Sequence, residues 1–138
     1  MSEKMNRLWQ SITGLPRWVQ VWVMILATTN MASLLFLDTD IGFWSAVAFF
    51  GVVSGLNMPM MFIQGGLTRA LSFPHLIWVP LLVYIYPSII GPNALDPASP
   101  VFQFGVAIVV VNGISLLFDF MECVRWLKGG REVLGLET

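Results

Sequence analysis

The sequence has very few of the residues that build metal and redox sites. Its 138 residues include one histidine, His75, and one cysteine, Cys123. A lone cysteine excludes a disulfide within the chain. One histidine and one cysteine also exclude, in a single chain, a tetrahedral zinc site or an iron–sulfur cluster built from these residues. We therefore predict neither a metal site nor a cofactor.

Charged residues are also scarce. They make up 11% of the chain, and 57% of its residues are apolar, whereas a soluble domain carries about 25% charged residues. The net charge of −1 and the lack of a dense basic cluster argue against nucleic acid as a partner. The sequence lacks the G-x-S-x-G, G-x-G-x-x-G, H-E-x-x-H and P-loop motifs, so we predict no catalytic residue and no enzyme activity.

Long apolar runs dominate what the sequence does contain. Four of them approach or exceed the roughly 20 residues that cross a bilayer as a helix, and they lie at about residues 17–37, 41–63, 74–90 and 101–126. We predict an all-α integral membrane protein, a four-helix transmembrane bundle formed by residues 17–126. A cytoplasmic tail follows at residues 127–138, and the lipid bilayer is the first expected partner.

The segment before the first run, residues 1–16, has a different pattern. Met5, Leu8, Trp9 and Ile12 recur at helical spacing, with polar and basic residues between them. This pattern predicts an amphipathic helix that lies on the membrane surface. A disordered basic tail is the alternative, because so short a helix is marginal without a surface to dock on.

Basic residues indicate the orientation in the membrane. With four spans, the seven Lys and Arg residues all fall on one side, before the first span, between the second and third, and after the fourth. The positive-inside rule makes that side cytoplasmic and places both termini there. The loops with Asp38, Asp40 and Asp96 then lie outside. We expect a plasma membrane or a bacterial inner membrane.

The last span carries acidic side chains well inside its length. Asn112, Ser115, Asp119 and Glu122 follow one another in steps of 3, 4 and 3 residues, which places them on one face of a helix. Asp119 lies about 9 Å inside the end of this span. Because a carboxylate at mid-bilayer costs about 3 kcal/mol, and somewhat less at this depth, we expect this face to meet protein or water.

Other polar side chains match this stripe in depth. Asn57 and Asp119 lie about 10 Å from the cytoplasmic boundary, and Asn30 and Asn112 lie about 20 Å from it. Matched depths predict a water-accessible path lined by these side chains, with Asp119 and Glu122 at its cytoplasmic end. The alternative is that the amides hold helix pairs together and the carboxylates are structural partners of basic residues.

Basic residues and glycines complete the set of candidate residues. Arg69, His75 and Arg125 are close enough in the predicted topology to pair with the carboxylates, and would gate the path or neutralise it. Gly51 and Gly55 form a GxxxG pair, the spacing of a helix-contact groove, and a kink is expected at Pro59.

Together these features lead to two hypotheses on function. The first is a homo-oligomeric channel or small-solute or ion transporter, because four helices hardly enclose a solvated pore without self-association. The second is a non-catalytic subunit or assembly factor, for which the polar stripe is a seam that docks other membrane subunits. A membrane enzyme acting on lipid or quinone is a third class, and would need a bound cofactor or substrate between the helices.

Overall fold

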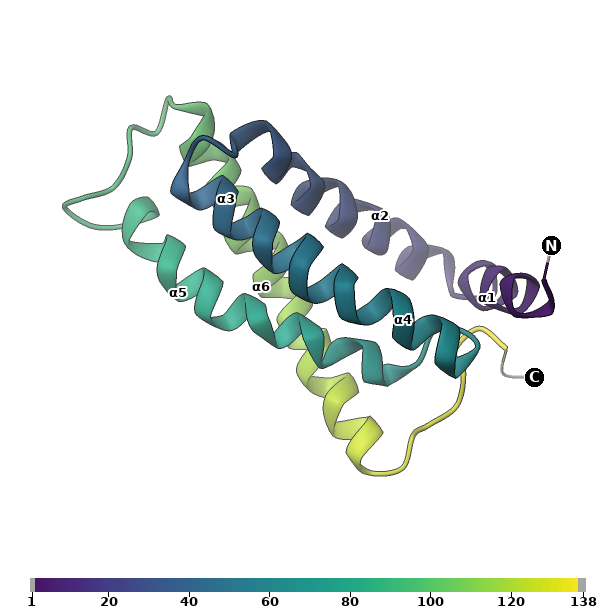
Figure 1. The fold of residues 1–138 in the computed structure, drawn as a ribbon. Coiled ribbons are helices and arrows are strands. Elements are labelled where there is room, and N and C mark those ends of the chain that lie inside the picture. Colours follow the sequence, from purple (N-terminus) through teal and green to yellow (C-terminus); the bar gives the residue numbers. More distant parts are fainter. Residues whose placement is uncertain (1, 137–138) are drawn as a thin grey trace.

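The computed structural model describes residues 2–136, and these residues form helices and connecting loops without a strand (Figure 1). Residue 1 of the predicted surface helix and residues 137–138 of the predicted tail lie outside the described part. Four stretches are long and apolar enough to cross a membrane, namely Arg17–Phe36, Asp40–Gln64, Arg69–Ile89 and Pro100–Leu127. The predicted all-α architecture with four apolar helices of spanning length is confirmed.

The N-terminal segment is a helix, α1 (Glu3–Thr13). The hydroxyl of Ser2 caps it by accepting a hydrogen bond from the Met5 N–H at 3.4 Å. Trp9 is 62% exposed on α1, whereas Ser11 is fully buried. The helix therefore has an unpartnered apolar side and a side that packs on the rest of the chain.

A tight turn joins the first two spans. The first span continues α2 (Arg17–Met31) as the 3₁₀-helix η1 (Ala32–Phe36), and the second begins with α3 (Asp40–Ala46). The Thr39 hydroxyl donates to the Phe36 carbonyl at 2.7 Å and accepts from the Gly42 N–H at 3.1 Å. A Cβ added at Gly42 would overlap the Phe36 carbonyl oxygen, so the two backbones approach closely here.

The middle of the second span is a π-helix, η2 (Val47–Ser54), and the span ends with α4 (Gly55–Gln64). Pro59 lies inside α4, where it lacks the N–H that would bond the Gly55 carbonyl. The π-helix η2 thus lies before Pro59, the residue at which the sequence predicts a kink. Gly51 and Gly55 are exposed, and the nearest atom to a Cβ built on Gly51 is Val47 Cγ1 at 4.0 Å.

The third span is longer than predicted. Two 3₁₀-helices, η3 (Arg69–Ser72) and η4 (Pro74–Ile77), precede α5 (Trp78–Ile89), so the span starts before Pro74. The first turn of this span contains polar residues, so the apolar run in the sequence begins later than the span does. Pro80 lies in the first turn of α5, directly after η4, a position at which proline is tolerated.

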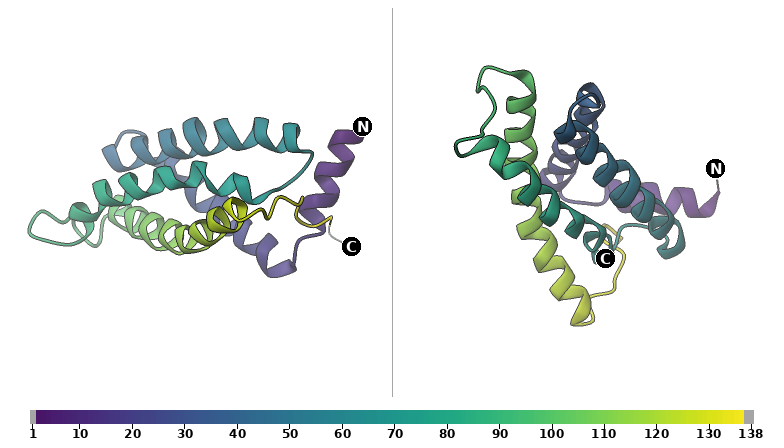
Figure 2. Two further views of the ribbon diagram at one scale, coloured as in Figure 1. Left: turned by 90° about the horizontal axis from the view of Figure 1, so that it is seen from below. Right: turned by 60° about the vertical axis from the view of Figure 1, so that its left-hand side comes forward.

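The fourth span, α6 (Pro100–Leu127), is central to the bundle. It contacts α2, α3 and α5 as well as η1, η3 and η4 (Figure 2). The side chains of Trp78, Ile85 and Ile108 are fully buried in the core between these helices. Because α6 contacts elements of all three other spans, the side chains on its inward face line the interior of the bundle.

The C-terminal segment folds back onto α1, so both termini lie at one end of the bundle (Figure 1), hereafter the terminal end. The Leu134 N–H donates to the Leu67 carbonyl at 2.7 Å. The Ser11 hydroxyl donates to the Leu134 carbonyl at 2.6 Å and accepts from the Leu67 N–H at 3.0 Å. We call α1, the loop 65–68 and residues 130–136 the terminal clasp.

Candidate functional site

The candidate site is the polar stripe of α6, which faces the interior of the bundle. Asn112 is fully buried, Ser115 is 4% exposed and Asp119 is 6% exposed. Glu122 lies one turn nearer the terminal end, and its side chain is 23% exposed. The side chain of Asp119 therefore lies among protein atoms.

Asp119 is held by two neighbours. Its Oδ1 lies 2.9 Å from Nδ1 of His75 on η4, and its Oδ2 accepts a hydrogen bond from the Ser115 hydroxyl at 3.2 Å. The side chains of His75 and Asp119 are 17% and 9% exposed. Both carboxylate oxygens of Asp119 thus have a side-chain partner.

His75 links this carboxylate to the second span. Its Nε2 lies 3.5 Å from Nδ2 of Asn57 on α4. Its ring stacks on Trp78 with centroids 4.6 Å apart and an angle of 8° between the planes. Oδ1 of Asn57 is buried and has no hydrogen-bond partner among the described residues. We call Asn57, His75, Asp119 and Ser115 the polar relay.

Asn30 and Asn112 form a separate pair at the α2–α6 interface. Nδ2 of Asn30 donates to Oδ1 of Asn112 at 2.8 Å, and Nδ2 of Asn112 donates back to Oδ1 of Asn30 at 3.0 Å. Asn30 also donates to the Leu26 carbonyl at 2.9 Å, and both asparagines are fully buried. Asn30 and Asn112 thus form a pair that contains no member of the polar relay.

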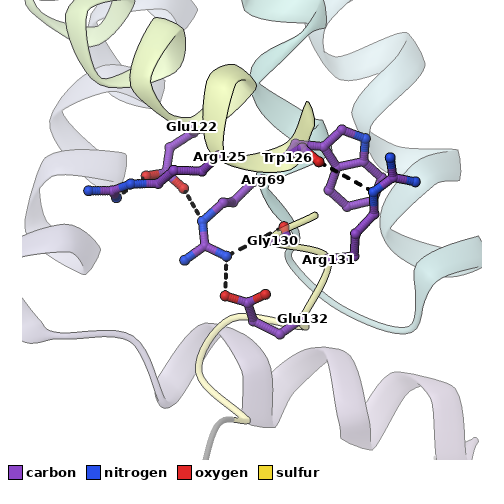
Figure 3. A network of polar contacts seen from close by, with 7 residues as sticks. All are labelled: Arg69, Glu122, Arg125, Trp126, Gly130, Arg131 and Glu132. Atoms are coloured by element: carbon purple, nitrogen blue, oxygen red, sulfur yellow. Dashed lines mark hydrogen bonds and ion pairs between the residues drawn. The ribbon is translucent and has the colours of Figure 1, made fainter. Parts of the chain in front are cut away.

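Glu122 belongs to a third cluster, around Arg69 (Figure 3). Nε of Arg69 lies 2.9 Å from Oε2 of Glu122, and Nη1 of Arg125 donates to Oε1 of Glu122 at 2.6 Å. Arg69 also pairs with Glu132 and donates to the Gly130 carbonyl at 3.5 Å. The guanidinium of Arg69 therefore ties the end of α6 to the terminal clasp.

Sequence reasoning missed Glu132 and Ser11. Glu132 lies in an irregular segment whose path has no periodic signal, and Ser11 bonds to backbone groups of Leu67 and Leu134. A charge in the tail opposite in sign to Arg69 was the one available clue. The predicted partners Arg69, His75 and Arg125 each contact one of the two carboxylates of α6.

The Arg69–Glu132 pair makes the terminal clasp sensitive to acid. The hydrogen bond from Arg69 holds the pKa of Glu132 below its ordinary value, so the folded state favours the carboxylate. Its stabilising contribution is present above the unfolded pKa, about 4.3, and is lost as pH falls through the lower folded pKa. We expect faster amide hydrogen exchange at residues 130–136 when the solution is acidified through this range.

The variant Glu132→Gln distinguishes loss of the Arg69–Glu132 pair from acid unfolding of the rest of the protein. The variant should exchange faster than the wild type at neutral pH and lose the acid-dependent step. Asp96→Asn, at the opposite end of the bundle, should keep the wild-type profile. An unchanged acid step in Glu132→Gln would show that the ion pair does not hold the clasp.

Two other features are relevant to ligand binding. Among residues 2–136 no group of three or more His, Cys, Asp and Glu side chains is arranged to hold a metal ion. An apolar cleft of about 420 Å³ lies between the second and third spans. It is lined by Trp44, Val47, Ala48, Val52, Ile77, Pro80, Leu81 and Tyr84. Its lining includes no member of the polar relay.

No protein-family model, curated protein or solved structure matches this chain.

Proposed function

We propose that the protein is an integral membrane transport protein, a gated channel or small-solute or ion transporter that works as a homo-oligomer. The observation that carries this proposal is the part-buried His75–Asp119 contact between two of the apolar helices, with Nδ1 and Oδ1 2.9 Å apart. Ionisable groups at such depth are costly and usually serve ion or proton pathways. Asp119 and Glu122 are the charged element of the proposed path.

The charge distribution supports a cytoplasmic terminal end. All seven Lys and Arg residues belong to segments at or next to this end, up to the first residue of α2, in η3, and from the last turn of α6 onward. By the positive-inside rule this end faces the cytoplasm of a plasma membrane or bacterial inner membrane. The polar relay then lies in the cytoplasmic half of the bundle.

The close packing of α2 on α6 within one chain supports self-association. Asn30 and Asn112 satisfy each other across the α2–α6 interface and are fully buried. A path at that depth therefore requires either movement of α2 against α6 or a second copy. The exposed pair Gly51 and Gly55 offers a flat helix surface on which another copy can pack closely.

The reciprocal Asn30–Asn112 pair also favours a second candidate, a non-catalytic subunit or assembly factor of a larger membrane complex. Side-chain amides that hydrogen-bond to each other across two helices are typical of a core with a structural role. Purification from the native membrane separates the two functions. A stable self-oligomer supports transport, whereas foreign membrane subunits in fixed stoichiometry support the alternative.

Asp119→Asn tests the transport proposal. The protein is reconstituted in lipid vesicles, and fluxes of K⁺, Na⁺, Cl⁻ and H⁺ are recorded under imposed gradients. We expect the variant to assemble normally and to lose flux by about tenfold or more, the change that about 1.4 kcal/mol in a barrier produces.

Asp38→Asn is the matched control for this measurement. Asp38 is exposed in the turn after η1, so the same chemical change there should leave flux intact. Wild-type flux in Asp119→Asn would remove the charged role of Asp119. The absence of any flux from the wild-type protein would contradict transport of these ions.

A further inference from the structure

We propose that the ion coupled to this transport is the proton, and that Nε2 of His75 binds it with Asp119 as the counter-ion and Asn57 as the group that senses it. This inference rests on the proposed function. It follows from the hydrogen-bond chemistry of the polar relay, whose two ends lie on different spans.

The first step is the position of the hydrogen on the imidazole of His75. An ionised carboxylate only accepts hydrogen bonds, so the 2.9 Å contact between Asp119 Oδ1 and His75 Nδ1 places the hydrogen on Nδ1. In a neutral ring Nε2 then carries a lone pair. Its neighbour is Nδ2 of Asn57 at 3.5 Å, longer than the usual 2.9–3.0 Å of such bonds.

The second step is the charge of the pair. With a neutral His75 and an ionised Asp119, the pair carries one uncompensated negative charge inside a membrane span. A proton taken up from water at Nε2 forms one N–H bond and converts the pair into an imidazolium and a carboxylate with no net charge. Neutral pairs are cheaper in a low-dielectric interior. The stacked Trp78 ring, 4.6 Å away, adds a cation–π contribution to the charged form.

The third step is the response of Asn57. Nδ2 of Asn57 suits the lone pair of Nε2, but it repels an N–H at the same place. Oδ1 of Asn57 is buried without a partner among the described residues. A half-turn of the amide would point Oδ1 at the new Nε2–H and give it the acceptor it needs. Both protonation states of His75 therefore have a matching orientation of the same side chain.

Asn57 also connects the proton to a helix that can move. It lies on α4, whose main contacts outside its own span are with α1 and η3. The π-helix η2 comes directly before α4, and π-helical segments are often found at functional sites. A changed Asn57–His75 contact would thus act on the half of the second span that is least held by α6.

Other charged groups near the pair already have partners. On α6, Glu122 already contacts Arg69 from η3 and Arg125. Cys123, also on α6, is buried. From α4 the neighbour is the uncharged Asn57, and from α5 it is Trp78. Arg69 further contacts Glu132 of the tail.

The single histidine makes the test direct, because a ¹⁵N-labelled histidine gives signals from His75 alone. The full-length protein is studied by NMR in lipid vesicles from about pH 5 to 8, the window in which histidine titrates. At high pH we expect a neutral ring protonated at Nδ1, and at low pH a ring protonated at both nitrogens. In Asp119→Asn the neutral ring should lose its preference for protonation at Nδ1, because an amide can donate to Nδ1 as well as accept from it.

Two further variants complete the design. Asp38→Asn should titrate as the wild type does. Asn57→Leu keeps the His75–Asp119 pair but removes the sensing amide, so it should retain the two-state titration and lose proton-dependent flux. A histidine that stays neutral across this range, or a neutral ring protonated at Nε2 in the wild type, would overturn the inference.

Failure of the inference is distinguishable from failure of the proposed function. Proton binding at His75 without flux in vesicles would contradict transport and leave the proton site intact. Flux that depends on Asp119 while His75 does not titrate would support transport and refute the proton site.

Discussion

Replacing His75 with leucine is expected to lower the unfolding free energy by about 3 kcal/mol, because a carboxylate that loses a partner costs at least as much as the roughly 1–3 kcal/mol of an unsatisfied polar group. The carboxylate of Asp119 would keep only the Ser115 hydroxyl at 3.2 Å as its partner. A larger loss is not expected, because the side chains of His75 and Asp119 are 17% and 9% exposed.

A double-mutant cycle tests the pairing itself. His75→Leu/Asp119→Leu removes both polar groups, and an apolar pair of similar size is nearly neutral or stabilising at such a site. We therefore expect the double variant to recover most of the stability that either single variant loses. Reversible unfolding in bilayers or mixed micelles measures all four proteins.

The same measurement includes a control variant and an outcome that would contradict the pairing of His75 with Asp119. Losses that simply add in the double variant would show that His75 and Asp119 do not interact. Asp96→Leu changes an exposed loop carboxylate and should alter stability by no more than about 0.5 kcal/mol.

Replacing Gly42 with alanine is the second large effect. A methyl group there would overlap the backbone carbonyl of Phe36, and backbone atoms on both sides of the turn cannot move aside as a flexible side chain can. Overpacking of this kind costs about 1–3 kcal/mol and occasionally more. We expect a loss of about 3 kcal/mol and a weakened α3–η1 contact, measured by the same unfolding assay.

Gly51→Ala is the matched control. A Cβ at Gly51 would have Val47 Cγ1 as its nearest neighbour, at an ordinary 4.0 Å. Alanine is also a better helix former than glycine by about 1 kcal/mol in water. Equal losses at Gly42 and Gly51 would contradict the close approach of the first two spans. A change in oligomeric state confined to Gly51→Ala would support the proposed contact between copies.

The contrast between these glycines shows where sequence reasoning stopped. The GxxxG spacing of Gly51 and Gly55 indicates a flat helix surface, but spacing does not say whether that surface faces the same chain or its surroundings. The turn at Thr39 sets the rotation of α3 relative to η1, and it brings Gly42 against Phe36. This rotation depends on a few backbone angles that carry no hydropathy signal.

The site was more accessible to sequence reasoning than the clasp. A helix has a fixed rise per residue, so the depth match grouped Asn30 with Asn112 and Asn57 with Asp119 before any contact was known. The clasp is held largely by backbone groups of Leu67 and Leu134 around Ser11. Every residue type except proline supplies both backbone groups, and no pattern of side chains identifies them.

The most direct test is the distance between His75 and Asp119 in a lipid bilayer. Solid-state NMR with ¹⁵N-labelled histidine and ¹³C-labelled aspartate measures the dipolar coupling between imidazole nitrogen and carboxyl carbon. The 2.9 Å contact between Nδ1 and Oδ1 predicts a strong coupling that is lost in Asp119→Asn, where position 119 no longer carries a labelled carboxyl carbon. A histidine with no carboxyl carbon nearby, and an Asp119 in contact with lipid acyl chains, would contradict the account.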